Sequence, residues 1–150
     1  MKLKIPPAFI FLFFGLLMYL LKEFFPVGQF EFFGRQYLIK MLTFVAVAIV
    51  VVAMVQFFRR RTTVDPMRPS KATSLVTKGI YAYSRNPMYL ALLLLLLAWG
   101  LWLGNAFNTL IAAGFVSYMN NFQIKPEEKA LSQRFGKEYQ HYCTQVRRWF

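Results

Sequence analysis

Four long apolar segments limit what this chain can fold into more than any other feature, and they cover approximately residues 5–25, 38–58, 88–103 and 106–122. A helix that crosses the hydrocarbon core of a bilayer needs about 20 mostly apolar residues, or somewhat fewer where its ends reach the interface. The segments therefore predict an all-α integral membrane bundle of about four transmembrane helices, followed by a C-terminal cytoplasmic helix.

Short interrupting sequences separate these segments. Pro7 stands in the first turn of the first segment, where a missing backbone N–H is harmless, and Pro26 follows its end. Three consecutive arginines, residues 59–61, stop the second segment. Gly104 and Asn105 leave room only for a tight turn between the third and fourth segments. We therefore expect the last two transmembrane helices to form a hairpin.

The net charge of +12 is distributed in a way that predicts membrane topology. Of the 18 Lys and Arg residues, seven lie between residues 59 and 85 and six more between residues 125 and 148, next to the ends of apolar segments. Cytoplasmic loops of membrane proteins carry such an excess of basic residues. We expect a cytoplasmic loop at residues 59–87, a cytoplasmic tail at residues 123–150, both termini in the cytoplasm, and no nucleic-acid partner.

We expect a single membrane domain, residues 1–150. The first apolar segment follows a basic start, but no small-residue cleavage site comes after it, so we expect an uncleaved helix. The lack of targeting signals favours a bacterial inner membrane. The single cysteine, Cys143, excludes an internal disulfide and a zinc site built from several thiolates, and we expect no metal site. His141 and Cys143 fit ordinary helix positions.

Polar residues suited to chemistry gather on the cytoplasmic side. Pro87 fits the first turn of the third helix, whose free N–H groups favour an anion, and Arg85 adds a forked cation beside it. Glu127 and Glu128 follow the fourth helix on the same side. Taken singly, Arg85 would be a snorkelling residue and the two acids would be helix N-terminal residues. Their ordered combination instead predicts a cofactor site.

In order and spacing, these residues resemble the isoprenylcysteine carboxyl methyltransferase and phospholipid methyltransferase superfamily, membrane enzymes that use S-adenosylmethionine. The resemblance covers roughly residues 62–149, whereas the first two apolar segments match only in kind. The patterns that carry it are Gly79-x-Tyr81, Arg85-Asn86-Pro87-x-Tyr89, and Glu127-Glu128-x-x-Leu131 followed by Phe135-Gly136-x-x-Tyr139-x-x-Tyr142.

The resemblance implies a fold in which S-adenosylmethionine lies between the loop, the ends of the hairpin helices and the C-terminal helix. It also implies an opening to lipid for an apolar substrate. Membrane lipids and a lipophilic small molecule or lipidated substrate would be the partners, and the oligomeric state is left open. Arg85 would be the catalytic residue, holding an anionic group of cofactor or substrate. By position, the cofactor-binding residues would be Tyr81, Arg85, Asn86, Pro87, Tyr89, Glu127 and Glu128.

The chain departs from the family pattern at two positions. Many members have His where this chain has Asn86, and Gly where it has Ala91. Asparagine can hydrogen-bond a cofactor but cannot titrate, so this position cannot supply a base. A carboxylate acceptor is already ionised at neutral pH, whereas an amine must first lose a proton. The sequence therefore favours carboxylate O-methylation slightly over N-methylation of a phospholipid amine.

A function of a different class stays open. The same two departures, Asn86 and Ala91, are compatible with a non-catalytic membrane scaffold or lipid-binding protein that keeps the family fold. A transporter or channel fits less well, because no ionisable residue interrupts the centres of segments 88–103 and 106–122.

Overall fold

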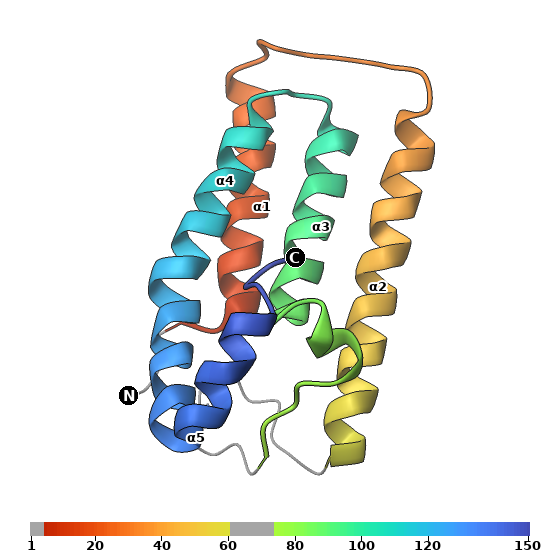
Figure 1. The fold of residues 1–150 in the computed structure, drawn as a ribbon. Coiled ribbons are helices and arrows are strands. Elements are labelled where there is room, and N and C mark those ends of the chain that lie inside the picture. Colours follow the sequence, from red (N-terminus) through yellow and green to blue (C-terminus); the bar gives the residue numbers. More distant parts are fainter. Residues whose placement is uncertain (1–4, 61–73) are drawn as a thin grey trace.

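The computed structural model of the chain describes residues 5–60 and 74–150, apart from the side chains of residues 57 and 60. The described residues are all-α, as predicted, and Figure 1 shows helices α1 to α4 running roughly antiparallel. In chain order the elements are α1 (Pro7–Phe24), α2 (Arg35–Arg60), the 3-10 helix η2 (Gly79–Ala82), α3 (Pro87–Leu103), α4 (Asn108–Tyr118), the π-helix η3 (Met119–Ile124) and α5 (Lys125–Gln145).

Helix α3 is the centre of the bundle, because it packs against α1, α2 and α4. Helix α2 approaches it through small side chains, of which Ala46 and Ala53 are fully buried. The largest core cluster joins α1, α3, α4 and η3, and it consists of Ile10, Met18, Tyr89, Leu96, Leu103, Ala112, Phe115, Met119 and Ile124.

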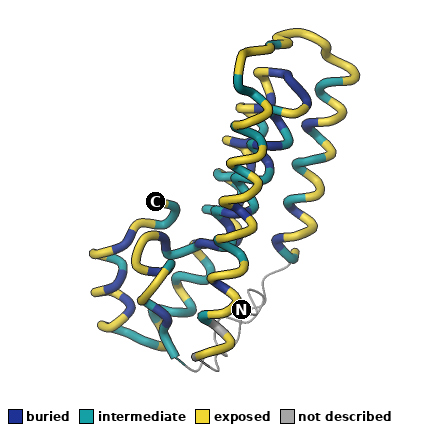
Figure 2. Tube along the Cα trace, turned by 90° about the vertical axis from the view of Figure 1, so that its right-hand side faces the viewer, coloured by how far each residue is buried: buried dark blue, intermediate teal, exposed yellow. Residues whose placement is uncertain are grey.

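Much of the surface of the helices is exposed, as Figure 2 shows in yellow, and on α1 and α2 many of the exposed residues are large and apolar. Phe9 on α1 is 66% exposed and Phe44 on α2 is 75% exposed. By length and composition, α1 and residues Arg35–Gln56 of α2 qualify as candidate membrane spans. In the most apolar 18 residues of each span, only 17% of the residues in α1 and 11% of those in α2 are buried within the protein. Helices that are both this apolar and this exposed favour a lipid environment over a soluble core.

The predicted fourth helix, residues 106–122, does not end where the prediction placed its end. Helix α4 continues through η3 into α5 without a break. Pro126 accounts for the wider π turn, because it has no N–H to give to the carbonyl oxygen of Phe122. The predicted C-terminal helix is α5, and its backbone turns at Gly136, whose φ of 51° favours glycine. The chain then folds back toward the start of α3 (Figure 1).

The loop before α3 is packed against α2. Val76 and Tyr81 form a cluster with Ala53 of α2. Gly79, with a φ of 66°, lies so close to Gln56 that a Cβ atom there would stand 1.6 Å from the side-chain nitrogen. Part of the predicted cytoplasmic loop, residues 61–73, lies outside the described residues.

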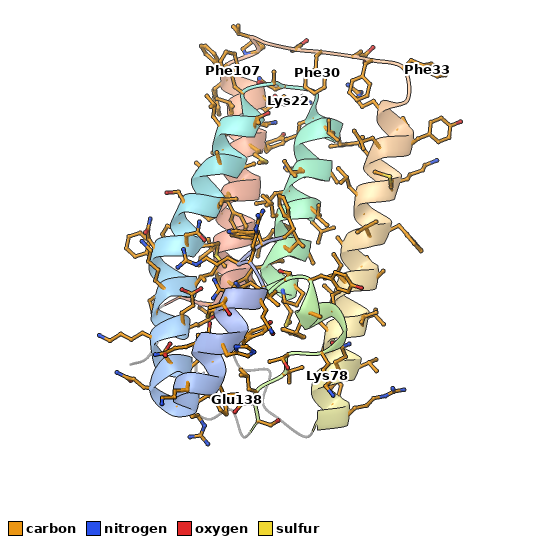
Figure 3. The ribbon with its side chains drawn as sticks, in the orientation of Figure 1. Lys22, Phe30, Phe33, Lys78, Phe107 and Glu138 are labelled. Carbon is orange, nitrogen blue, oxygen red and sulfur yellow. The ribbon has the colours of Figure 1, made fainter. Side chains whose placement is uncertain are left out.

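The opposite end of the bundle contains the predicted hairpin turn between α3 and α4. Gly104 takes a φ of 71°, and Asn105 forms an antiparallel bridge with Gln29. The side chain of Asn105 also accepts a hydrogen bond from the backbone N–H of Phe107 at 3.0 Å and donates one to the carbonyl oxygen of Phe25 at 3.2 Å. Figure 3 labels the side chains Lys22, Phe30, Phe33 and Phe107 at this end.

Candidate functional site

The predicted site residues come from elements that meet at one end of the bundle. Asn86 is the N-cap of α3 and Pro87 begins the helix, with Tyr89 in its first turn. Glu127 and Glu128 lie in the first turn of α5. The hairpin of α3 and α4 brings these two helix starts together, because the chain leaves α3 at the far end and returns along α4.

Tyr89 and Glu127 form one direct contact between the two motifs. The Tyr89 hydroxyl donates a hydrogen bond to Glu127 Oε1, with Tyr89 buried and Glu127 half-buried. Burial raises the pKa of the Glu127 carboxyl to about 8, against the lowering effect of the Tyr89 hydrogen bond and with a further rise from the Glu128 charge. This carboxyl group therefore exchanges its proton close to neutral pH.

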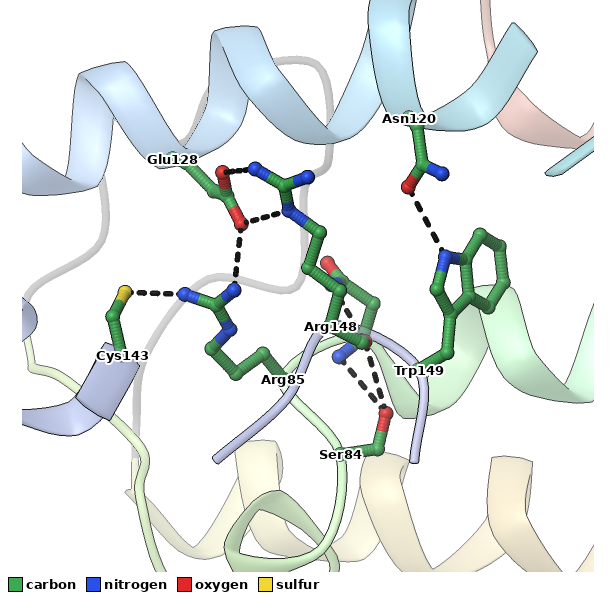
Figure 4. A network of polar contacts seen from close by, with 8 residues as sticks. Ser84, Arg85, Asn120, Glu128, Cys143, Arg148 and Trp149 are labelled. Atoms are coloured by element: carbon green, nitrogen blue, oxygen red, sulfur yellow. Dashed lines mark hydrogen bonds and ion pairs between the residues drawn. The ribbon is translucent and has the colours of Figure 1, made fainter. Parts of the chain in front are cut away.

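Arg85 forms the second contact. Its Nη2 lies 3.2 Å from Glu128 Oε1, and its Nη1 contacts the sulfur of Cys143 (Figure 4). Its backbone N–H donates to the carbonyl oxygen of Arg147 at 3.0 Å. Its Nε is buried and has no hydrogen-bond partner among the described residues. Because a buried donor without a partner is unfavourable, Arg85 is suited to an acceptor supplied by a ligand.

A further part of the site was not predicted from the sequence, namely the last five residues, 146–150, which we call the C-terminal strap. Arg148 donates from Nε to Glu128 Oε1 at 2.8 Å and from Nη2 to Oε2 at 2.7 Å. The carbonyl oxygen of Arg148 accepts from Asn86 Nδ2 at 3.0 Å and from Ser84 Oγ at 3.3 Å. Together with the bond from the Arg85 N–H to the Arg147 carbonyl, the strap thus contacts three of the predicted site residues, Arg85, Asn86 and Glu128.

Trp149 anchors the strap. Its Nε1 donates to Asn120 Oδ1 at 3.1 Å, and its ring packs against the largest core cluster. One signal for Arg148 existed, since a chain with six acids and 18 bases offers many cations to a buried carboxylate. That signal does not identify which Lys or Arg residue pairs with Glu128. Contacts to the Arg148 carbonyl leave no trace in the sequence, because every residue carries that group.

Three further positions that the sequence singled out have clear surroundings. The Tyr81 side chain belongs to the cluster against α2, and its carbonyl oxygen accepts a hydrogen bond from the Tyr142 hydroxyl at 2.6 Å. Ala91, where many members of the resembling superfamily have Gly, is fully buried on α3. Asn86 uses its side chain as a donor toward the strap, which a neutral amide can do without titrating.

The donor set fits S-adenosylmethionine. Two carboxyl groups complement its hydroxyl and ammonium groups, and the unused Nε of Arg85 complements a carboxylate. The described residues contain no group of three or more His, Cys, Asp or Glu side chains that could hold a metal ion.

Two known proteins match parts of the chain. A relative in Schizosaccharomyces pombe, protein-S-isoprenylcysteine O-methyltransferase, is 33% identical over 94 residues, which are 63% of this chain and 40% of the yeast protein. The chain thus matches less than half of that enzyme's length. An uncharacterized protein of Haemophilus influenzae is 53% identical over 62 residues, 41% of this chain and 98% of that protein. No solved structure matches.

The match to a family profile is the broadest of these comparisons. The profile described as phospholipid methyltransferase covers residues 34–138, more than two thirds of the chain. This range includes α2, α3, α4 and the first part of α5, and it contains Arg85, Asn86, Glu127 and Glu128. The resemblance stated from the sequence is confirmed, and the chain belongs to the phospholipid methyltransferase family.

Proposed function

We propose that the protein is an integral membrane methyltransferase that uses S-adenosylmethionine to methylate a lipophilic or lipidated acceptor at the cytoplasmic interface. The observation that carries the proposal is the meeting of two separate family motifs. Tyr89 contacts Glu127, 38 residues further along the chain, and Arg85 pairs with Glu128. Two carboxyl groups, a phenol and a guanidinium are thereby gathered at the start of α3.

In the proposed arrangement, α1, α2, α3 and the continuous helix of α4 and η3 all cross the membrane as one domain, residues 1–150. The 17 residues of α3 rise about 26 Å, slightly less than the hydrocarbon core of a typical bilayer, which thinned lipid accommodates. The basic residues around the site support a cytoplasmic location for this end and for both termini, in keeping with a bacterial inner membrane.

When bound, S-adenosylmethionine supplies a methyl group on a positively charged sulfur, ready for direct transfer to a nucleophile. The protein then has to bind the cofactor and the acceptor, align them with each other, and exclude water. Glu127 and Glu128 would accept hydrogen bonds from hydroxyl or ammonium groups of the cofactor. Arg85 would hold an anionic group of cofactor or substrate through its unused Nε. The remaining pocket residues would be Tyr81, Asn86, Pro87 and Tyr89.

An apolar groove supports a lipophilic acceptor. It opens between α1 and α2 over α3, has a volume of about 730 Å³, and is lined by residues such as Phe11, Leu95 and Trp99. Leu95 lies six residues beyond Tyr89, so the groove begins about 9 Å along α3 from the candidate site. Such walls suit an isoprenoid or acyl chain.

The proposed acceptor group is a carboxylate, which needs no base, and Asn86 supplies none. The relative named as an isoprenylcysteine O-methyltransferase supports this choice. One observation favours a second candidate, N-methylation of a phospholipid amine. Burial raises the pKa of the Glu127 carboxyl to about 8, so its ionised form is a stronger base than an ordinary carboxylate and is suited to take a proton from an ammonium group.

Calorimetry on detergent-purified protein tests the cofactor site. We expect the wild type to bind S-adenosylmethionine and its demethylated product, and Arg85→Ala to weaken both affinities about tenfold or more. Lys78→Ala, which removes an exposed base from the same loop, is the matched control and should bind like the wild type. Folded wild-type protein that binds neither compound would refute the methyltransferase proposal.

Transfer of labelled methyl groups to membrane lipid extracts tests the acceptor. Mild alkali releases methanol from a methyl ester but leaves an N-methyl group attached. Volatile label after alkali therefore supports a carboxylate acceptor, and label that stays non-volatile on the released headgroup supports an amine. Cofactor binding without transfer to any extract would favour the non-catalytic scaffold that the sequence left open.

A further inference from the structure

The C-terminal strap lies across the candidate cofactor site. Its residue Arg148 binds Glu128 with its side chain and Asn86 with its backbone, so a single residue joins the start of α5 to the start of α3. We propose that Arg148 is a positioning residue of the cofactor site, acting through Glu128. This inference rests on the proposed function, because the cofactor is the ligand that the positioned carboxylate would bind.

The geometry of the pair supports positioning. The Arg148 guanidinium meets both oxygens of Glu128 at 2.8 and 2.7 Å, a fork that fixes the carboxylate plane as well as its place. Glu128 Oε1 has a second partner in Arg85 at 3.2 Å. Each carboxylate oxygen has two lone pairs, so Oε2 keeps capacity to accept a hydrogen bond from a ligand. The strap therefore orients Glu128 and still leaves its carboxylate able to accept a hydrogen bond from a ligand.

The burial of the pair makes this orientation effective. The Glu128 side chain is 18% exposed and that of Arg85 is 12% exposed, whereas Arg148 reaches in from a half-exposed position at 37%. Charged hydrogen bonds in such sheltered places are stronger than those on an open surface. Without Arg148, Arg85 would be the only cation paired with Glu128 among the described residues.

The strap has further attachments that hold Arg148 in place. Ser84, which is 2% exposed, and Asn86 both donate to its carbonyl oxygen. The next residue, Trp149, is fixed by Asn120 and by the core. These contacts also give Asn86 a role that His would perform differently, because the amide donates to a backbone carbonyl at the edge of the site.

The test compares Arg148→Ala with Arg147→Ala in full-length protein. Both variants lose one positive charge, but the Arg147 side chain is exposed and only its backbone contacts the site. Two quantities are measured, namely the affinity for S-adenosylhomocysteine by calorimetry and the rate at which a maleimide labels Cys143. Cys143 is the chain's single cysteine and packs against the cluster that contains Val146, the first residue of the strap, so its labelling reports whether the strap is docked without requiring activity.

We expect Arg148→Ala to weaken binding about tenfold and to speed labelling of the cofactor-free protein, while Arg147→Ala leaves affinity within about twofold. Arg148→Lys keeps the charge but not the fork, so it should restore part of the affinity. Faster labelling with unchanged affinity would reduce the strap to a structural element and overturn the proposal. Tighter binding in Arg148→Ala would overturn it too, by making the strap a competitor.

The outcomes stay separate from the test of the proposed function. If wild-type protein fails to bind the cofactor, the proposed function fails and the inference falls with it. If the wild type binds and Arg148→Ala binds equally well, only the positioning role is lost. Should Arg148→Ala not fold, Arg148→Lys still decides the matter, because a wild-type affinity in that variant would show that the fork is not needed.

Discussion

The two ends of the bundle hold distant parts of the chain together by different means. Opposite the site, the side chain of Asn105 pairs with main-chain groups of Phe25 and Phe107, so both its amide groups are satisfied. At the site end, charged side chains bind one another: Arg85 and Arg148 both pair with Glu128. The first end is joined through main-chain groups, whereas the second is joined through charged side chains.

The comparison predicts that mutations at the two ends will change different measured properties, namely the free energy of unfolding at one end and the ligand affinity at the other. Satisfied contacts to the main chain contribute to the free energy of unfolding. A charged cluster with spare hydrogen-bonding capacity contributes to affinity, because a ligand completes it. Mutations at the far end should therefore change stability alone, and those at the site end should change ligand binding most.

The largest expected effect is at Glu128. Glu128→Ala removes the proposed acceptor for the cofactor and leaves the Arg85 and Arg148 cations without their shared anion, so affinity for S-adenosylhomocysteine should fall about a hundredfold. Calorimetry measures it. Glu138→Ala, an exposed acid on the same helix, is the control and should bind normally. Wild-type affinity in Glu128→Ala would remove the basis for calling this end a binding site.

The next effect is at the opposite end. Asn105→Ala leaves the N–H of Phe107 and the carbonyl of Phe25 without their side-chain partner, and it should lower the free energy of unfolding by about 2 kcal/mol. Denaturation in detergent measures this loss, with Gln133→Ala at an exposed position as control. Cofactor affinity should not change. A parallel loss of affinity would mean that the two ends do not have separate roles.

A smaller effect concerns pH. The Glu127 carboxyl, with its pKa raised by burial from 4.5 to about 8, keeps a proton in the folded protein that the unfolded chain releases above pH 4.5. Stability therefore falls as the pH rises from 4.5 through 8. Glu127→Gln cannot titrate and should reduce this loss by at least about 1 kcal/mol, measured by denaturation at pH 5 and at pH 8.5. Identical slopes in both proteins would contradict the raised pKa.

The smallest effect is at Tyr89. Tyr89→Phe removes the hydrogen bond that opposes the rise of the Glu127 pKa, so that pKa should move above its wild-type value. The loss in the free energy of unfolding should be about 1 kcal/mol at neutral pH, because the ring still packs in the core. Denaturation across a pH series measures both changes. A downward shift of the titration would show that the hydroxyl does not stabilise the ionised carboxylate.

Much of the fold could be predicted, because apolar length and proline position act locally. Helices α1 and α3 begin within two residues of the predicted starts, each with proline in its first turn, and the turn at Gly104 and Asn105 is where the glycine required it. The continuous run from α4 to α5 was not predicted. A π turn depends on how Pro126 is accommodated between packed helices, and apolar patterning does not report that.

The candidate site was also predicted only in part. The motif residues Arg85, Tyr89, Glu127 and Glu128 meet in the structure, although their binding roles stay a prediction. The strap was missed for two reasons. Its return depends on one positive φ at Gly136, and its contacts to Ser84 and Asn86 run through a backbone carbonyl. A backbone atom has no residue type that a motif could record.

The return of the chain at Gly136 has a practical consequence for fusing tags to the protein. Because the strap ends at the site, an affinity tag or fluorescent protein fused after Phe150 begins two residues from Arg148. Such a fusion adds bulk at the wall of the site and pulls on the anchor formed by Trp149. A tag that a protease removes before binding is measured leaves this wall unchanged.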